Sequence, residues 1–154
     1  MNINEIVVPT GKILITLYNT ITKKYDQDLV DNMFVTAGKN ALAASISGTT
    51  SDNKGIITYC ALGTSSVAPA LSDTGLLAEV GRKLVSVRSF SGNVATFQTF
   101  FTPSEGNGTL REAGLYGDDA SGSAGTGTLF CRAAINRTKT SSDTLSLSWS
   151  ITIG

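Results

Sequence analysis

Few residues in this chain could do chemistry, and Glu112 is the first of them. It lies in the otherwise apolar segment 110–116, beside Arg111. A carboxylate-based hydrolase would need a second carboxylate close to Glu112, and the spacing of the acidic residues places none there. The sequence has no histidine, which removes Ser-His-Asp and Cys-His nucleophile pairs, the common zinc sites and the usual general base near neutral pH. The sequence therefore predicts a protein that is not an enzyme and has no catalytic residue.

Glu112 is interpreted instead as a structural residue. A charge in a buried strand has to be paired, and Arg82, Arg88 and Arg132 are the candidate partners from other strands. Arg82 also lies three residues after Glu79, a spacing typical of a local ion pair on a helix. We expect an ion pair or a hydrogen-bonded carboxylate that stabilises the fold.

Asp118 and Asp119 are weak candidates for a calcium site. They lie in the glycine-rich segment 117–127, and Ca²⁺ takes oxygen ligands from flexible loops. Two adjacent carboxylates are not a complete ligand pattern for a metal ion. The closely spaced glycines of the same segment do not indicate a phosphate-binding loop either, because no helix follows whose N-terminus could bind a phosphate. The preferred interpretation is a flexible hairpin tip, with no metal and no cofactor.

The two cysteines, Cys60 and Cys131, each lie in an apolar run. Buried free thiols that pack as small hydrophobic groups are the preferred interpretation. A disulfide between neighbouring strands is the alternative, because two cysteines alone do not define a disulfide framework.

Composition excludes several classes of partner. The 12 basic and 12 acidic residues cancel, and charged residues make up only 16% of the chain. Nucleic-acid binders carry a basic excess or stripe, so we expect no nucleic-acid partner. No apolar run is long enough for a transmembrane helix, and the N-terminus lacks the basic region of a signal peptide. We therefore expect no membrane partner, and folding in a cytosol.

The first 11 residues are predicted to form an extended arm in front of a single domain, residues 12–154. Its apolar residues are Ile3, Ile6, Val7 and Val8. Such an arm either packs on its own domain or reaches a neighbouring copy.

One short α-helix is predicted over about residues 37–47. Small and apolar residues recur there at helical spacing, Thr36 is the candidate N-cap, and Gly48 stands where a helix-ending glycine belongs. Packing is its expected role.

The remaining segments have the composition of β-strands separated by turns. The clearest is 144–153, in which Leu145, Leu147, Trp149, Ile151 and Ile153 alternate with serine and threonine. One face of this strand should lie in the core, with Trp149 as a structural residue, and the other should face solvent or a neighbouring subunit. Strands are expected at 12–18, 56–62, 83–90, 94–102, 109–116, 128–135 and 144–153. We therefore predict an all-β protein, an antiparallel β-sandwich of about six or seven strands or a related barrel.

Aromatic residues leave one alternative open. Phe97, Phe100, Phe101, Phe130 and Trp149 lie inside strand runs and are interpreted as core residues. The tyrosines fit either the core or the surface, and exposed ones would stack on sugars in a glycan-binding module.

Several segments, in their order along the chain, resemble small structural proteins of tailed bacteriophages and prophages. These segments are 34–43, 57–64, 68–76, 79–82, 110–116 and 138–145 with the closing strand, so the match spans roughly residues 34 to 153. The first 33 residues lie outside it.

The resemblance implies a non-enzymatic virion component in a tail, fibre-adaptor, baseplate or collar position. A head-surface (capsid decoration) protein and a receptor- or glycan-binding module on the particle are the alternatives. The implied partners are other copies of the chain, in a homo-oligomer, and other virion proteins. The implied location is the virion, after assembly in the cytoplasm of a bacterial host.

Overall fold

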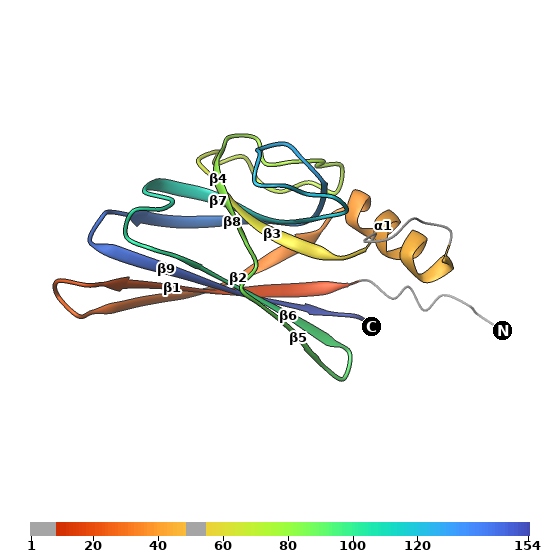
Figure 1. Cartoon of the computed structure of the whole chain (residues 1–154), viewed down its shortest axis with the longest axis horizontal. Helices are drawn as coiled ribbons and strands as arrows, with labels where there is room; N and C mark the ends of the chain where they lie inside the picture. The colour runs from red at the N-terminus through yellow and green to blue at the C-terminus, as the bar shows by residue number, and fades with distance from the viewer. Residues whose placement is uncertain (1–8, 49–54) are drawn as a thin grey trace.

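The chain folds mainly into β-strands, as the sequence predicts. A computed structural model describes residues 9–48 and 55–154, and within them nine strands and one helix (Figure 1). The elements are β1 (Thr10–Asn19), β2 (Tyr25–Phe34), α1 (Thr36–Ser47), β3 (Ile57–Gly63), β4 (Glu79–Leu84), β5 (Val87–Ser91), β6 (Val94–Phe101), β7 (Gly108–Gly117), β8 (Thr128–Lys139) and β9 (Asp143–Thr152).

The nine strands form one curled antiparallel sheet, and this corrects the prediction of a six- or seven-stranded sandwich. Their order is β4-β3-β7-β8-β2-β1-β9-β6-β5. Two strands were missed for identifiable reasons. The polar sequence of β2 was interpreted as part of a loop, and the single strand expected over 83–90 is divided between β4 and β5.

The sheet curls because two stretches of chain pass from one half to the other. The first eight residues of β2 pair with β1, whereas Met33 and Phe34 pair with β8. On the opposite side, β4 leads into β5 through Val85 and Ser86, whose N–H groups donate to Thr58 O and Gln98 O. We call strands β4, β3, β7 and β8 the β7 half, and strands β2, β1, β9, β6 and β5 the β9 half.

The core lies between the inner faces of the two halves. From the β9 half, the predicted alternation places Leu145, Leu147, Trp149 and Ile151 in it, each at most 3% exposed. The β7 half contributes Cys60, Leu62, Leu110, Leu115, Cys131 and Ala133.

Two residues expected in the core lie elsewhere. Ile153 follows the end of β9 and is 40% exposed. Phe100 is 45% exposed, because the buried position at this end of β6 is occupied by its neighbour Phe101, and adjacent strand residues point to opposite faces.

Helix α1 covers one end of the curled sheet (Figure 1). Val35 is its N-cap, so Thr36 is the first helical residue instead of the cap, and the helix ends at Gly48 in the left-handed conformation. A Cβ on Gly38 would lie 2.6 Å from Phe130 Cα, so the helix approaches β8 backbone to backbone. No helix in the described part of the chain is long and apolar enough to span a membrane.

Candidate functional site

Glu112 lies on the outer face of β7 and is fully buried. Among the three candidate partners, the structure places Arg132 of β8 beside it, with Arg132 Nη2 2.8 Å from Glu112 Oε2. Arg132 also reaches Asp73, with Nη1 2.7 Å from Asp73 Oδ2. Sequence reasoning missed Asp73, because nothing in its own segment indicates that it faces a buried arginine.

This ion-pair cluster fixes the segment 64–78 on the outer face of the β7 half. Glu112 accepts hydrogen bonds from Leu77 N at 3.1 Å and Ala78 N at 2.7 Å, and Arg132 donates to Val67 O at 2.9 Å. Both Glu112 oxygens are thereby used by the protein itself. The arrangement is that of a structural cluster, because both oxygens accept hydrogen bonds from Arg132 or from the segment that the cluster holds.

The charges of the cluster are mutually stabilised. Burial acts to raise the pKa of Asp73, but hydrogen bonds from Ala70 N and the Arg132 guanidinium hold it below its ordinary value. Burial acts to lower the pKa of Arg132, and the hydrogen bonds to Asp73 and Glu112 raise it overall. Both groups therefore remain charged across the physiological pH range.

Arg82 performs a similar role for the segment 118–127. Its pairing with Glu79 is real, with Arg82 Nε 2.6 Å from Glu79 Oε1, but the pair lies on β4 and not on a helix. A bulge at Val80 brings both side chains to one face, because Gly81 pairs with Leu62 while Glu79 pairs with Gly63.

Arg82 then reaches across to the loop and to an aromatic ring. Its Nη1 donates to Thr126 O at 2.9 Å, and its guanidinium lies 4.4 Å from the centre of the Tyr116 ring. The loop 118–127 belongs to the segment 117–127 that the sequence predicts as a flexible hairpin tip, and a specific contact holds it to the β7 half.

Asp118 and Asp119 adopt left-handed backbone conformations, with φ values of 50° and 70°. Asp118 is buried, and its Oδ1 accepts a hydrogen bond from Gly55 N. Within residues 9–48 and 55–154, no three potential metal-ligating side chains of His, Cys, Asp or Glu gather. The geometry therefore gives the Asp118 carboxylate a structural contact with the residues that precede β3.

Cys60 and Cys131 are both buried and free. Each pairs with Leu115, Cys60 from β3 and Cys131 from β8, so two strand spacings, about 10 Å, separate them. A disulfide requires a Cα–Cα distance below about 7 Å. Burial raises the pKa of Cys60 to about 12, and the side chains of Trp149 and Thr99 oppose that shift only in part.

The outer face of the β9 half has a different character. We call it the open face; its members by register are Thr10, Lys12, Leu14, Thr16, Tyr18, Tyr25, Gln27, Leu29, Asp31, Val87, Ser89, Ser91, Val94, Thr96, Gln98, Phe100, Thr144, Ser146, Ser148, Ser150 and Thr152. Its only charges, Lys12 and Asp31, pair with each other at 2.7 Å. Leu29 is 59% exposed opposite Leu14, so large apolar groups stand among hydroxyl side chains.

An aromatic hollow occupies one part of the open face. The rings of Tyr18 and Tyr25 lie 4.5 Å apart, and Phe100 stands across Thr144 and Ser146 from them. The sequence alone left the tyrosines undecided and assigned Phe100 to the core, so it did not predict this group.

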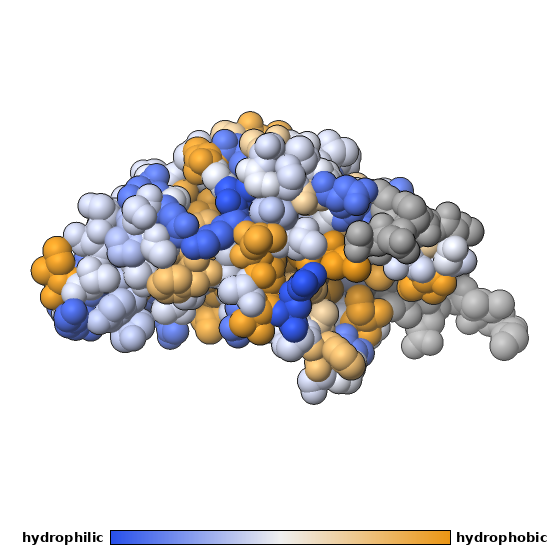
Figure 2. Space-filling model, in the orientation of Figure 1, coloured by the Kyte–Doolittle hydropathy of each residue, from blue (hydrophilic) through white to orange (hydrophobic). Residues whose placement is uncertain are grey.

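Exposed hydrophobic residues also lie along β4 and β5, the two edge strands of the sheet. Figure 2 shows hydrophobic residues gathered over the middle of the visible face, where β4 passes into β5. Val80, Leu84, Val87 and Phe90 are 45–82% exposed along this path.

Two residues that the sequence assigned to the arm lie in the sheet instead. Thr10 and Gly11 belong to β1 and pair with Thr152 and Ile151 of β9, because their backbone continues the ladder. Ile3, Ile6, Val7 and Val8 lie outside the described residues.

Comparison of the chain with protein-family models, curated proteins and solved structures finds no match.

Proposed function

We propose that this protein is a non-enzymatic structural component of a tailed-phage virion, which assembles through protein–protein contacts in a tail, fibre-adaptor or collar position. The open face is the observation that carries the proposal. The resemblance of several sequence segments to phage structural proteins indicates the kind of particle to which the protein would belong.

The open face has the chemistry of a contact surface. Burying an unpaired charge in an interface is costly, and this face has only the Lys12–Asp31 pair. Burying a serine or threonine side chain costs little free energy when its hydroxyl finds a hydrogen-bond partner. Covering exposed apolar groups such as Leu29 stabilises a complex. An antiparallel sheet that buries one face and leaves the other free is suited to docking.

The charged clusters support a non-enzymatic role. Glu112 accepts hydrogen bonds from Arg132 and from two backbone N–H groups, and Arg82 is used by Glu79 and Thr126. A catalytic acid or base needs a free position at which a substrate atom can bind. These groups are committed to the fold.

The molar mass of the purified protein in solution tests the proposal. We expect a discrete homo-oligomer that dissociates when the open face is charged by the double substitution Leu14→Lys and Leu29→Glu. The two positions are cross-strand partners, so the new charges pair and β1 and β2 remain together.

Val67→Glu is the matched control, because Val67 is 58% exposed on the segment that covers the β7 half. It should leave the oligomer intact. A double variant with the same molar mass as the wild type would show that the open face is not the assembly surface.

A head-surface position on the particle would use the same contact chemistry. A receptor- or glycan-binding module is favoured by one separate observation, the aromatic hollow of Tyr18, Tyr25 and Phe100 beside hydroxyl groups, since aromatic rings stack on sugars. Binding of purified protein to immobilised host polysaccharide, abolished by Tyr25→Ala, would support that function.

A further inference from the structure

Strands β1 and β2 part at one end of the β9 half and leave a wedge between them. Gly11 and Asn32 are the last paired residues. Beyond them Thr10 stays with β9, whereas Met33 and Phe34 turn away to β8. The resulting cavity of about 550 Å³ is also lined by Lys39 of α1 and by Leu71.

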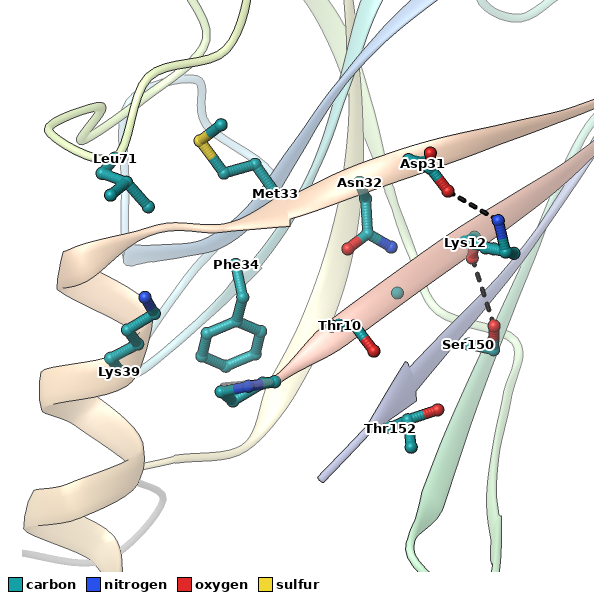
Figure 3. A pocket seen from close by; sticks show the side chains of 12 residues that line it. Thr10, Lys12, Asp31, Asn32, Met33, Phe34, Lys39, Leu71, Ser150 and Thr152 are labelled. Carbon is teal, nitrogen blue, oxygen red and sulfur yellow. Dashed lines mark hydrogen bonds and ion pairs between the residues drawn. The ribbon is translucent and has the colours of Figure 1, made fainter. Parts of the chain in front are cut away.

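The wedge has apolar walls and contains two polar groups of interest, the Asn32 amide and the Lys39 ammonium group. Figure 3 shows Asn32 and Phe34 pointing from β2 toward β1, with Lys39 on the neighbouring helix α1. Among residues 9–48 and 55–154, neither polar atom of the Asn32 amide has a hydrogen-bond partner, although both atoms are buried. Lys12 and Asp31 pair with each other, while Lys39 has no ion pair within the described residues.

We propose that this wedge binds residues 1–8 of a second copy of the chain. The segment reads Met-Asn-Ile-Asn-Glu-Ile-Val-Val, so it brings apolar side chains to an apolar cleft. Its only charged side chain is Glu5, which complements Lys39. A peptide backbone also carries both the donor and the acceptor that the Asn32 amide lacks.

The chain direction favours a neighbour's segment over the chain's own. Pro9 and Thr10 themselves line the wedge, and the chain enters β1 directly from them. To lie along the residues of its own wedge, the segment would have to reverse its direction at Pro9, and the fixed φ of proline disfavours such a reversal. A reversal would also use about four of the eight residues.

The segment is long enough to link two copies. Eight extended residues span about 26 Å, which allows the segment to leave one copy and lie in the wedge of the next. Exchange of such segments builds either a reciprocal dimer or a ring. The inference rests on the proposed assembly function and names one contact that holds the assembly together.

A charge exchange in the full-length chain tests the contact. Glu5→Lys and Lys39→Glu, made separately, each place like charges in the wedge, and we expect each to weaken self-association about tenfold in concentration-dependent light scattering. Lys24→Glu is the matched control: it makes the same charge change at the exposed β1–β2 turn and should have no effect.

Mixing the two single variants identifies which chain supplies the segment. Opposite charges then meet only between unlike copies, so association should return to the wild-type level if the segment is exchanged. If each segment occupied its own wedge, mixing would restore nothing and only the double variant would recover.

Cysteine cross-linking locates the contact independently of affinity. Val7→Cys protein mixed with Met33→Cys protein should give a cross-linked dimer in which peptide mapping joins positions 7 and 33. Ile21→Cys, in the β1–β2 turn and 74% exposed, should not cross-link to position 7.

The inference is overturned if the charge variants associate as the wild type does, or if only the double variant recovers. It is also overturned if position 7 cross-links equally well to positions 21 and 33. Loss of association in the open-face variant together with intact association in Glu5→Lys would leave the proposed function standing and remove the wedge contact alone.

Discussion

The outer faces of the two halves of the curled sheet differ: within the described residues, that of the β7 half is covered by other segments of the chain, and that of the β9 half is not. In the β7 half the outward positions of the strands carry groups such as Glu112, Tyr116 and Arg132, all buried beneath the segments 64–78 and 118–127. In the β9 half the outward positions carry serine, threonine, glutamine and a few large apolar groups, and these are exposed or half-buried.

The difference shows how side-chain chemistry decides whether a sheet face is covered. A carboxylate and a guanidinium on adjacent strands can hold the backbone of a loop through several charge-assisted hydrogen bonds. Hydroxyl groups offer no such anchor, so the open face stays available to a partner. The β7 half is therefore the fixed support and the β9 half is the docking side.

The largest effect is expected from breaking the anchor of the β7 half. Arg132→Met leaves the buried Glu112 carboxylate without its cation, which should lower the free energy of unfolding by about 3–5 kcal/mol. Chemical denaturation measures it. Adding Glu112→Gln should recover part of the loss; a double variant as unstable as the single one would show that packing, and not the unpaired charge, dominates.

The two faces of β9 should respond very differently to neighbouring substitutions. Leu147→Ala opens a cavity in the core and should cost about 2–5 kcal/mol. Ser148→Ala, one residue later on the open face, should change stability by less than about 0.5 kcal/mol. Equal losses at both positions, measured by thermal or chemical unfolding, would contradict the assignment of inner and outer faces.

A pH-dependent effect of intermediate size is expected at the β4 side of the β7 half. The hydrogen bonds from Lys83 and from Thr102 N lower the pKa of Glu105 from 4.5 to about 2. Because the unfolded chain takes up this proton first, the contribution of Glu105 is present above pH 4.5 and is lost as the pH falls toward 2. Glu105→Gln should therefore show a shallower decline of stability over that window.

A small effect on stability is expected from substituting the two thiols, which test the core and not the surfaces. Cys60→Ala and Cys131→Ala should each be tolerated, with losses near 1 kcal/mol. Iodoacetamide at pH 8 should leave both thiols unmodified in the folded protein and modify both in denaturant, since each is buried and only the thiolate reacts. Rapid modification of native protein would mean that the inner faces separate readily.

Much of the molecule follows from local pattern. The alternation of 144–153, the helix near 37–47 with Gly48 at its end, and the mainly-β class are all readable from the chain, because each depends on spacing that is set within a few residues. The need of Glu112 for an arginine was also readable, since a carboxylate in an apolar strand must be paired.

Other features were decided only by the tertiary structure. β2 is a strand because β1 supplies its ladder, not because its polar sequence favours one. The identity of Arg132 as partner, the role of Asp73, the exposure of Phe100 and the wedge at Asn32 all depend on which strands become neighbours. Sequence spacing fixes which residues share a face of one strand, but only the assembled sheet determines what each face meets.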